Sequence, residues 1–429
     1  ITSADMGYIF EELIRKFSES YDEQAGAHFT SRDIIYLMTE LLVAPEKNTI
    51  MAEGCTKTAY DMAMGTSQML GCLTERLQSI SAEASLTCFG QEFNPETYAI
   101  AKADMLIKGG NASGMKYGDT LSDDAFVGYA FDYIISNPPF GIDWKREKTQ
   151  VENEAKRGFD GRFGPGLPAI SDGQMLFMLN GVKKLKEGSG RMAIIQNGSS
   201  LFTGDAGSGA SEIRRYVIEG DLVEAIIQLP TDLFYNTGIS TYIWLLTKGK
   251  AMHRSGKVQL IDASKCFVKR RKNIGSKRVD LDDDCIDLIL RAYEEFADET
   301  YENGDLVVES KVFDNTFFGF TKVTVETAQT DADGNLILKK GKKQPVKDAT
   351  DTEIIPLSED RDAYMKKNVL PYNPLAYIDA TKDKIGYEIP FTRLFYKFVP
   401  PVPSEEIFAE IKELATEESA LMKELFGHA

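Results

Sequence analysis

The sequence predicts an α/β protein with a doubly wound, mostly parallel sheet, and two observations lead to this fold class. Between about Thr49 and Lys248, short apolar runs alternate with stretches of helical periodicity, as in folds whose strands are joined by helices. One run, Tyr133 to Ile135, is aromatic and β-branched without polar alternation, which is typical of a strand covered on both faces. In such sheets ligands bind beyond the carboxyl ends of the strands, so the residues that follow each strand are the candidate site.

The individual elements follow from the local patterns. The expected strands are short apolar runs at Leu86–Phe89, Tyr133–Ser136, Met192–Gln196, Leu222–Leu229 and Ser240–Thr247. The expected helices have apolar residues at helical spacing and include Pro95–Lys108, Gln174–Leu185 and Ser211–Glu219. The last two strands flank Pro230–Gly238 closely enough to form a hairpin, which would put an antiparallel strand into the sheet.

The pattern divides the chain into three expected parts. Residues 1–48 form a helical segment, residues 49–250 hold the α/β sheet, and residues 251–429 form an α+β extension. The extension contains a basic cluster between Lys265 and Arg278, which is typical of a solvated loop, and ends in an amphipathic helix at Ser404–Phe426. That helix is either core packing or a docking surface for another subunit. The helical periodicity of the first segment rests on Ile9, Leu13 and Phe17, and on Ile34, Leu37, Met38 and Leu41.

Composition narrows the class of protein. The five cysteines form no CxxC pair and the three histidines are scattered, so neither disulfides nor a zinc site is indicated. No apolar run approaches the roughly 20 residues of a membrane helix, so we expect a cytoplasmic protein without a membrane partner. The formal net charge is −17, whereas a chain that holds DNA alone is expected to be basic. Either the substrate is not DNA, or a partner supplies the contacts with DNA.

The most informative stretch is the turn that ends the Tyr133–Ser136 strand, formed by Asn137, Pro138, Pro139 and Phe140. Neither proline has a backbone N–H, so the carbonyl oxygens and the Asn137 amide oxygen are acceptors with little local competition. Two such acceptors can hold the hydrogens of a planar amino group, and Phe140 can stack on the base that carries it. The alternative interpretation is an ordinary strand-ending turn with Phe140 in the core.

Three further stretches, in the right order, can build a nucleotide-like pocket at the strand ends. Tyr60 to Leu70 ends in a loop of small residues followed by a helix, where a ligand can approach the backbone closely. Glu92 follows the next strand, where a carboxylate can hold two ribose hydroxyls. Asp119, between Gly118 and Thr120, offers an acceptor for an adenine amino group.

This order resembles the S-adenosylmethionine-dependent amino methyltransferases of DNA, and more narrowly the modification subunit of type I restriction-modification systems. Three stretches carry the resemblance: Gly26–Arg32, which is similar to a cofactor-contacting GxxFTPR motif; Gly90–Tyr98; and Leu201–Gly209 leading to Leu229–Gly238. The similarity runs from about Met6 to Phe426. It implies a Rossmann-like methyltransferase catalytic domain at residues 49–250, a terminal helix that docks on another subunit, and a further helical domain before Ile1.

The resemblance also implies the roles of single residues. Phe29 would lie near the adenine of the cofactor, Asp61 near its methionine part, Glu92 at the ribose and Asp119 at the adenine amino group. The residues implied to bind S-adenosylmethionine are Ala27, His28, Phe29, Thr30, Ser31, Arg32, Asp61, Gly65, Thr66, Ser67, Gln68, Glu92, Asp119 and Thr120. The residues implied to hold and stack the target adenine are Asn137, Pro138, Pro139 and Phe140.

The sequence departs from the family pattern near the methionine part of the cofactor. Met62, Met64, Ser67 and Gln68 stand where the family usually has Asp-Pro and a glycine-rich turn, and Ser31 replaces the usual proline. Side chains therefore occupy positions where glycine leaves room and permits positive φ. On this ground Gln68 is expected to crowd the pocket, and Gln68→Gly to improve cofactor binding in a calorimetric titration.

The function that the resemblance implies is methyl transfer from S-adenosylmethionine to the N6 amino group of adenine in duplex DNA. The target base has to leave the helix to reach Asn137. The implied partners are DNA, a separate DNA-specificity subunit, a restriction subunit with motor and nuclease activity, and a second copy of this chain. In that setting the acidic charge is reasonable, because the partners supply contacts with DNA.

Two other functions stay open. An Asn-Pro-Pro turn can also present acceptors to a carboxamide, as in methylation of a glutamine side chain in a protein. A non-catalytic assembly subunit is the second, with the altered Met62 to Gln68 loop marking lost activity. The interpretation of Gly204–Gly209 as the dinucleotide-binding loop of an oxidoreductase is disfavoured. The stretch has no GxGxxG pattern, and no acidic strand end follows it.

Overall fold

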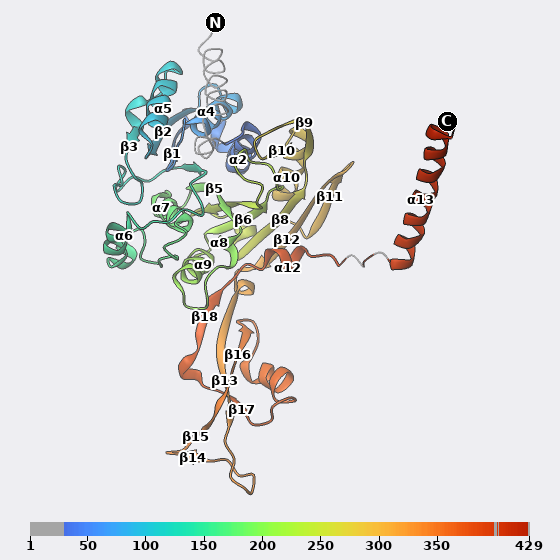
Figure 1. Cartoon of the computed structure of the whole chain (residues 1–429). Coiled ribbons are helices and arrows are strands. Elements are labelled where there is room, and N and C mark those ends of the chain that lie inside the picture. The colour runs from blue at the N-terminus through green and yellow to red at the C-terminus, as the bar shows by residue number, and fades with distance from the viewer. Residues whose placement is uncertain (1–29, 399–400, 402, 428–429) are drawn as a thin grey trace. The chain divides into compact units, whose positions relative to one another are not determined.

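The computed structural model describes residues 30–398, 401 and 403–427, and its centre is a ten-stranded sheet (Figure 1). From edge to edge the strands are β11 (Glu299–Asn303), β12 (Leu306–Asp314), β8 (Lys257–Lys265), β6 (Val223–Gln228), β7 (Thr241–Thr247), β5 (Arg191–Asn197), β4 (Tyr133–Ser136), β1 (Thr56–Asp61), β2 (Ser85–Glu92) and β3 (Met115–Tyr117). β7 and β12 run antiparallel to their neighbours, whereas the joins from β3 to β5 and between β6 and β8 are parallel. The sheet confirms the mostly parallel α/β fold.

All five predicted strands are present, and they correspond to β2, β4, β5, β6 and β7. The predicted hairpin is also confirmed, because β6 and β7 pair antiparallel with Ile227 opposite Ile243. β7 therefore lies between β5 and β6, and these two strands point the same way. β1 and β3 were not predicted, although β1 carries the acidic residue Asp61 at its end.

The sheet continues beyond residue 250. β8 pairs in parallel with β6, and β12 pairs antiparallel with β8, so residues of the expected extension join the main sheet. Ile261 and Val308 accordingly belong to the same buried core as the strands of residues 49–250. By compactness, the described residues up to Pro390 form one unit, and those from Phe391 form a second. The finer division at residue 48 stays a prediction.

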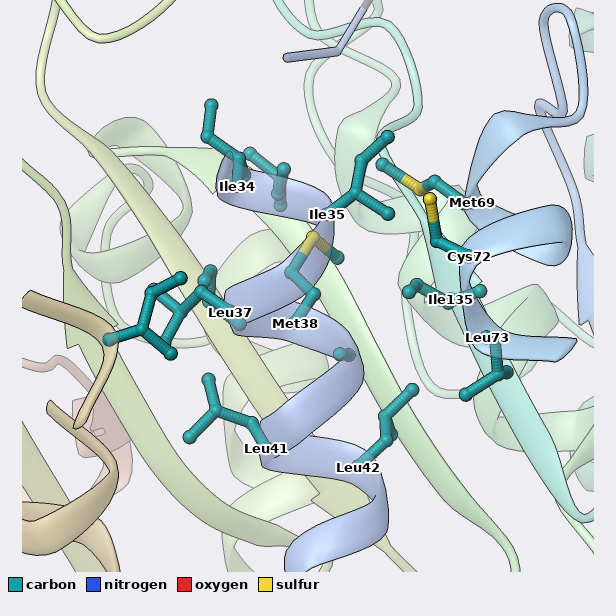
Figure 2. Close-up of a cluster of buried hydrophobic side chains, with 14 of the residues drawn as sticks. Ile34, Ile35, Leu37, Met38, Leu41, Leu42, Met69, Cys72, Leu73 and Ile135 are labelled. Carbon is teal, nitrogen blue, oxygen red and sulfur yellow. The ribbon is translucent and has the colours of Figure 1, made fainter. Parts of the chain in front are cut away.

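One face of the sheet is covered by helices that share a single apolar core. These helices are α2 (Arg32–Val43), α4 (Gln68–Ile80), α5 (Pro95–Ile107) and α10 (Asp283–Glu295). On α2 the predicted apolar stripe of Ile34, Leu37, Met38 and Leu41 is fully buried, and Figure 2 shows it beside Met69, Cys72 and Leu73 of α4. Each such side chain contributes about 1.5 to 3 kcal/mol on burial, so α2 is held firmly against the sheet.

The opposite face is covered by α7 (Gln174–Lys184) and α9 (Gly209–Glu219). A Cβ atom added to Gly181 of α7 would lie 2.2 Å from the sulfur of Met192 on β5. The next residue, Ala193, belongs to the core on the first face. Because successive residues of a strand point to opposite faces, α7 lies on the second face, and the sheet is doubly wound as predicted.

The remaining elements lie outside the main sheet. A second sheet contains β13 (Gly319–Ala328), β16 (Pro345–Pro356), β17 (Ala376–Ile378) and β18 (Lys384–Tyr387). Two hairpins pair β9 (Val268–Ile274) with β10 (Lys277–Asp280), and β14 (Leu338–Lys339) with β15 (Lys342–Lys343). The shorter helices are α3 (Lys47–Ile50), α6 (Lys148–Ala155), α8 (Ser199–Phe202), α11 (Arg361–Tyr364) and α12 (Phe391–Phe395). The predicted terminal helix is confirmed as α13 (Ser404–Phe426), with Ile407, Ile411, Leu414 and Leu421 exposed.

The cysteine side chains of the described residues are all free thiols. Cys72, Cys88, Cys266 and Cys285 are free and buried, and Cys55 is free and half-buried. Among the described residues, no group of three His, Cys, Asp or Glu side chains could hold a metal ion. Within the same ranges, every helix is too short or too polar to cross a membrane.

Candidate active site

A cavity of about 640 Å³ opens at the carboxyl ends of the central strands. Asp61 at the end of β1, Glu92 at the end of β2 and Asn137 directly after β4 all line it. β1 and β4 are neighbours, and the strand order runs from β1 toward β3 on one side and from β4 toward β5 on the other. The cavity therefore lies where the strand order reverses, which is where doubly wound sheets bind ligands.

Glu92 is fixed by backbone donors on both carboxylate oxygens. Gly65 N donates to its Oε2 at 2.9 Å, and Asn94 N donates to its Oε1 at 2.8 Å. The residue is buried, yet it lines the cavity. A carboxylate has about four lone-pair sites, so each oxygen can accept one more hydrogen bond from a ligand hydroxyl. Glu92 is thus a rigid acceptor at the cavity wall, and its contact with two ribose hydroxyls stays a prediction.

Asp61 is a buried carboxyl with an unusual protonation equilibrium. Ser136 Oγ donates to its Oδ1 at 2.7 Å, and Ala63 N donates to the same oxygen at 3.1 Å. Burial raises the pKa of Asp61 to about 7, the negative charge of Glu92 adds to this rise, and the two hydrogen bonds oppose it. Asp61 therefore changes its charge near neutral pH while it lines the cavity.

The amide of Asn137 is oriented by a residue from far away in the sequence. Its Nδ2 donates to the Thr30 hydroxyl at 2.9 Å, and Thr30 also lines the cavity. Its Oδ1 is buried and has no hydrogen-bond partner in the described part of the chain. A buried acceptor without a partner is costly, so a site that keeps one is suited to a donor on a ligand. Asn137 lines the cavity with that acceptor held in place.

The rest of the turn is divided between cavity and core. Pro139 lines the cavity, whereas Pro138 and Phe140 are not among its lining residues. Phe140 is half-buried and packs against the main apolar core. The role of Phe140 in stacking on a base stays a prediction. The turn continues into Gly141, whose N–H donates to Asp172 Oδ1 at 3.2 Å.

At the third strand end the acceptor is Asp119. Its Oδ1 accepts hydrogen bonds from Leu121 N at 2.7 Å and Ser122 N at 3.0 Å, which fixes the side chain at the cavity wall. Glu147, which precedes α6, lines the cavity as well. Burial raises the pKa of Glu147, and the nearby charge of Asp119 raises it further. The cavity therefore has an acidic wall around the predicted adenine position.

Thr120 lines the cavity, and its hydroxyl donates to the Met62 carbonyl at 2.6 Å. Its contact with the cofactor stays a prediction. Arg162 holds the same loop through two hydrogen bonds. Its Nη1 donates to the Thr120 carbonyl at 2.6 Å, and its Nη2 donates to the Leu121 carbonyl at 3.1 Å. Arg162 is buried and forms an ion pair with Glu154 at 2.7 Å. No motif or spacing in the sequence pointed to this arginine.

The altered loop before α4 is only partly exposed to the cavity. Gly65 has a φ of 52°, a conformation that glycine adopts without strain. Ser67 has a φ of 66°, is fully buried, and donates from its Oγ to the Ala101 carbonyl at 3.5 Å. Thr66 and Gln68 line the cavity, whereas Ser67 does not. The contact of Ser67 with the cofactor therefore stays a prediction.

The predicted cofactor-contacting stretch Ala27 to Arg32 is described by the structure only from Thr30 onward. Ala27, His28 and Phe29 lie outside the described residues. Of the remaining three, Thr30 lines the cavity, and Ser31 and Arg32 are not among its lining residues. Ser31 Oγ instead accepts a hydrogen bond from Lys277 Nζ at 3.2 Å.

Lys277 was assigned to a basic cluster typical of a solvated loop, but its side chain is buried. Besides Ser31, its ammonium contacts Asp33 Oδ2 at 2.8 Å and donates to the Leu233 carbonyl at 3.0 Å. The ammonium therefore ties β10 and the loop after β6 to the start of α2. Lys277 thus differs from its neighbour Lys272, which is exposed as expected for the loop.

Several lining residues were not predicted. They come from the segment after the turn and from the start of α7, and they are Ile142, Asp143, Trp144, Arg146, Glu147, Gly173 and Phe177. Phe93 also lines the cavity and is 58% exposed. An exposed aromatic directly after an acidic strand end is a usable sequence signal, since nothing in the core requires it there.

Comparison with known proteins gives a family match and several relatives. The profile of the N-6 DNA methylase family matches residues 2–333. The methylase subunit of the type I restriction enzyme MjaIX from Methanocaldococcus jannaschii is 26% identical over 271 residues, which cover 62% of this chain and 46% of that relative. The HindI methylase subunit from Haemophilus influenzae is 28% identical over 264 residues, which cover 60% and 54%. The chain spans about half the length of the curated relatives it matches.

Solved structures share the fold. The methyltransferase subunit of a type I restriction-modification system from Streptococcus thermophilus aligns with a TM-score of 0.54 at 27% identity, covering 67% of this chain and 55% of that chain. A structure described in terms of complex assembly and conformational transition of the type I system aligns with a TM-score of 0.52 at 16% identity, covering 98% and 69%. With its cavity at the reversal point of this sheet and a profile match over most of its length, the chain belongs to the N-6 DNA methylase family.

Proposed function

We propose that this chain transfers a methyl group from S-adenosylmethionine to the N6 amino group of adenine in DNA, as the modification subunit of a type I restriction-modification complex in the cytoplasm. One observation carries the proposal. The Asn137 Oδ1 acceptor has no partner in the described structure, and it lines the same cavity as the ribose-type acceptor Glu92. An amine acceptor and a nucleoside site in one cavity are what amino methylation requires.

The residues present fit S-adenosylmethionine. The cavity volume of about 640 Å³ lies within the usual range for cofactor pockets. Asp61, Glu92, Asp119 and Glu147 give it an acidic lining, which suits a ligand with a sulfonium and an ammonium group. When bound, the cofactor supplies a methyl group that the sulfonium already activates.

The chain's own part in the reaction is to position the target amino group and to orient the side chain that binds it. Asn137 Oδ1 accepts one hydrogen of the target amino group, which favours the pyramidal form whose lone pair can attack. The Thr30 hydroxyl holds the Asn137 amide so that the oxygen and not the nitrogen faces the amine. The amine loses a proton after it gains the methyl group, and Asn137 is not a base, so this proton passes to water.

Glu92 and Asp119 fix the nucleoside part of the cofactor in this proposal. Backbone N–H groups hold both carboxylates before any ligand arrives, so little side-chain entropy is lost on binding. The proposed contacts are Glu92 with the ribose hydroxyls and Asp119 with the adenine amino group. Of the predicted stretch 27–32, Thr30 lines the cavity in the described part of the chain.

The proposed partners are DNA, a DNA-specificity subunit, a restriction subunit and a second copy of this chain. The formal charge of −17 supports partners that supply the contacts with phosphates. α13 supports a docking role, because several apolar residues on this helix are exposed: Ile407, Phe408, Ile411, Leu414, Leu421 and Leu425. Relatives described as type I methylase subunits support the same assembly.

The test is methyl transfer by the full chain together with its specificity subunit, with tritiated S-adenosylmethionine. We expect label in duplex DNA as N6-methyladenine, and loss of at least a hundredfold in rate for Asn137→Ala. Label in protein instead of DNA would favour glutamine methylation. Undiminished methylation of DNA by Asn137→Ala would show that the assigned role is wrong, and no transfer by the native complex would favour an assembly subunit.

A further inference from the structure

Gln68 combines two properties that the proposed methyl transfer does not require. It lines the cavity although only 6% of its surface is exposed, and its Nε2 has no hydrogen-bond partner in the described part of the chain. Leaving a buried amide donor without a partner costs about 1 to 3 kcal/mol. A donor kept in that state at a cavity wall indicates a ligand acceptor.

Gln68 also begins α4, a helix of 13 residues. The N-cap residue Ser67 makes no side-chain hydrogen bond to the helix, and the first turn contains no acidic residue. The first N–H groups of a helix have no partner inside the helix, and together with the helix dipole they attract negative charge. Gln68 thus brings two kinds of donor to the lining of the cavity, its side-chain amide and the amino end of the helix that it begins.

The cavity is otherwise lined by the carboxyls of Glu92, Asp119 and Glu147, which repel an anion. Glu92 lies close to this end, but its Oε2 already accepts a hydrogen bond from Gly65 N in the loop before α4. An anionic group of a ligand in this acidic cavity therefore needs hydrogen-bond donors, and the start of α4 offers them.

We propose that the Gln68 side-chain amide, with the amino end of α4, binds the carboxylate of the amino-acid part of the cofactor and makes the site selective for cofactors that carry it. The inference rests on the proposed function, because it takes the ligand to be S-adenosylmethionine. It reverses the expectation from sequence that Gln68 crowds the pocket. Gln68→Gly removes a donor, so it weakens binding instead of improving it.

Arg146 is the other donor to consider, because it lines the cavity and carries a positive charge. Its side chain is exposed and it lies in the segment after the turn, whereas Gln68 is buried at a helix start. An exposed arginine contact is screened by water and salt, and a buried amide contact is not. Arg146 therefore adds attraction at the rim, and Gln68 sets the selectivity.

The test compares two ligands by isothermal titration calorimetry on the full chain. S-adenosylhomocysteine carries the carboxylate, and S-adenosyl-3-thiopropylamine has the same nucleoside and ammonium without it. We expect Gln68→Met, which keeps the length of the side chain and removes the amide, to weaken S-adenosylhomocysteine about tenfold. This is the loss of one hydrogen bond to a charged group. Binding of the amine should change less than twofold.

Two variants complete the design. Gln68→Glu places a carboxylate at the same position, so the preference between the two ligands should invert in favour of the amine. Glu92→Gln should weaken both ligands alike, since both carry the ribose. A thermal unfolding curve identifies which Gln68 variants are folded, and either folded variant decides the question.

The outcomes separate this inference from the proposed function. If the native chain binds S-adenosylhomocysteine and the Gln68 variants weaken both ligands equally, or neither, the inference is wrong and the cofactor assignment stands. If the native chain binds neither ligand, the cofactor assignment itself fails. Selective loss of S-adenosylhomocysteine in Gln68→Met is the result that supports the carboxylate site.

Discussion

Thr30 and Asn137 are 107 positions apart in the sequence, and a hydrogen bond of 2.9 Å from Asn137 Nδ2 to Thr30 Oγ1 joins them at the cavity. This contact sets which end of the Asn137 amide faces the proposed methyl acceptor. It also joins the segment that precedes α2 to the turn that follows β4. The orientation of the Asn137 amide thus depends on a residue outside the sheet.

Thr30→Val should lower the rate of methyl transfer about tenfold while Thr30→Ser retains most of it, because only the hydroxyl orients Asn137. The effect is expected on kcat more than on the KM for S-adenosylmethionine, and steady-state kinetics on the complex measures both. A fall in kcat of equal size in the valine and serine variants would contradict the orienting role.

Asp61→Asn should change how stability depends on pH. In the folded chain the raised pKa, about 7, keeps Asp61 protonated where the unfolded chain has already lost that proton. The folded state therefore binds more protons between about pH 4 and 7, so stability falls as pH rises through this range. The variant should lack that fall, and gain roughly 2 kcal/mol over the native chain between pH 5 and pH 8. Urea unfolding at the two pH values measures the difference.

Lys277→Met should destabilise the chain by about 3 kcal/mol, because it leaves Asp33 without its buried ionic partner and frees the Leu233 carbonyl. Lys272→Met is the matched control, since this lysine of the same hairpin is exposed and should change stability by less than about 0.5 kcal/mol. Denaturant unfolding of both variants gives the comparison. Equally small changes in the free energy of unfolding for both variants would show that Lys277 behaves as a solvated residue, as the sequence predicted.

The isolated chain should bind DNA weakly, with a dissociation constant above about 10 μM at physiological salt. Its formal charge of −17 opposes contact with phosphates. Fluorescence anisotropy with labelled duplex DNA, with and without the specificity subunit, tests this expectation. Tight binding by the chain alone that weakens steeply with added salt would contradict it.

The parts of the fold that the sequence predicted depend on local patterns. β4 ends at Ser136 because two prolines follow, and α13 has the predicted bounds because its apolar stripe is uninterrupted. β1 was missed because its sequence, which includes Lys57 and Asp61, is unusually polar for a buried strand. The buried polar groups of these residues are paired with side chains outside the strand, such as Lys57 with Glu46, and no periodic pattern in the sequence shows such a pair.

The site was predicted in a similar, partial way. Asp61, Glu92, Asp119 and Asn137 follow strands in order, so their common location follows from the fold class. The Thr30 contact and the burial of Lys277 come from segments brought together by tertiary structure, and spacing along the chain carries no information about them. The C-terminal continuation of the sheet was missed for the same reason.

The buried thiol of Cys72 gives the molecule an internal reporter. It lies on α4, one turn beyond Gln68, and Figure 2 shows it near Met69 in the shared core. Burial both shields this thiol and raises its pKa to about 11, so it reacts only when α4 separates from its neighbours. The alkylation rate of one cysteine therefore measures how often the pocket wall opens, and a ligand that closes the wall will slow the reaction without any label having been introduced.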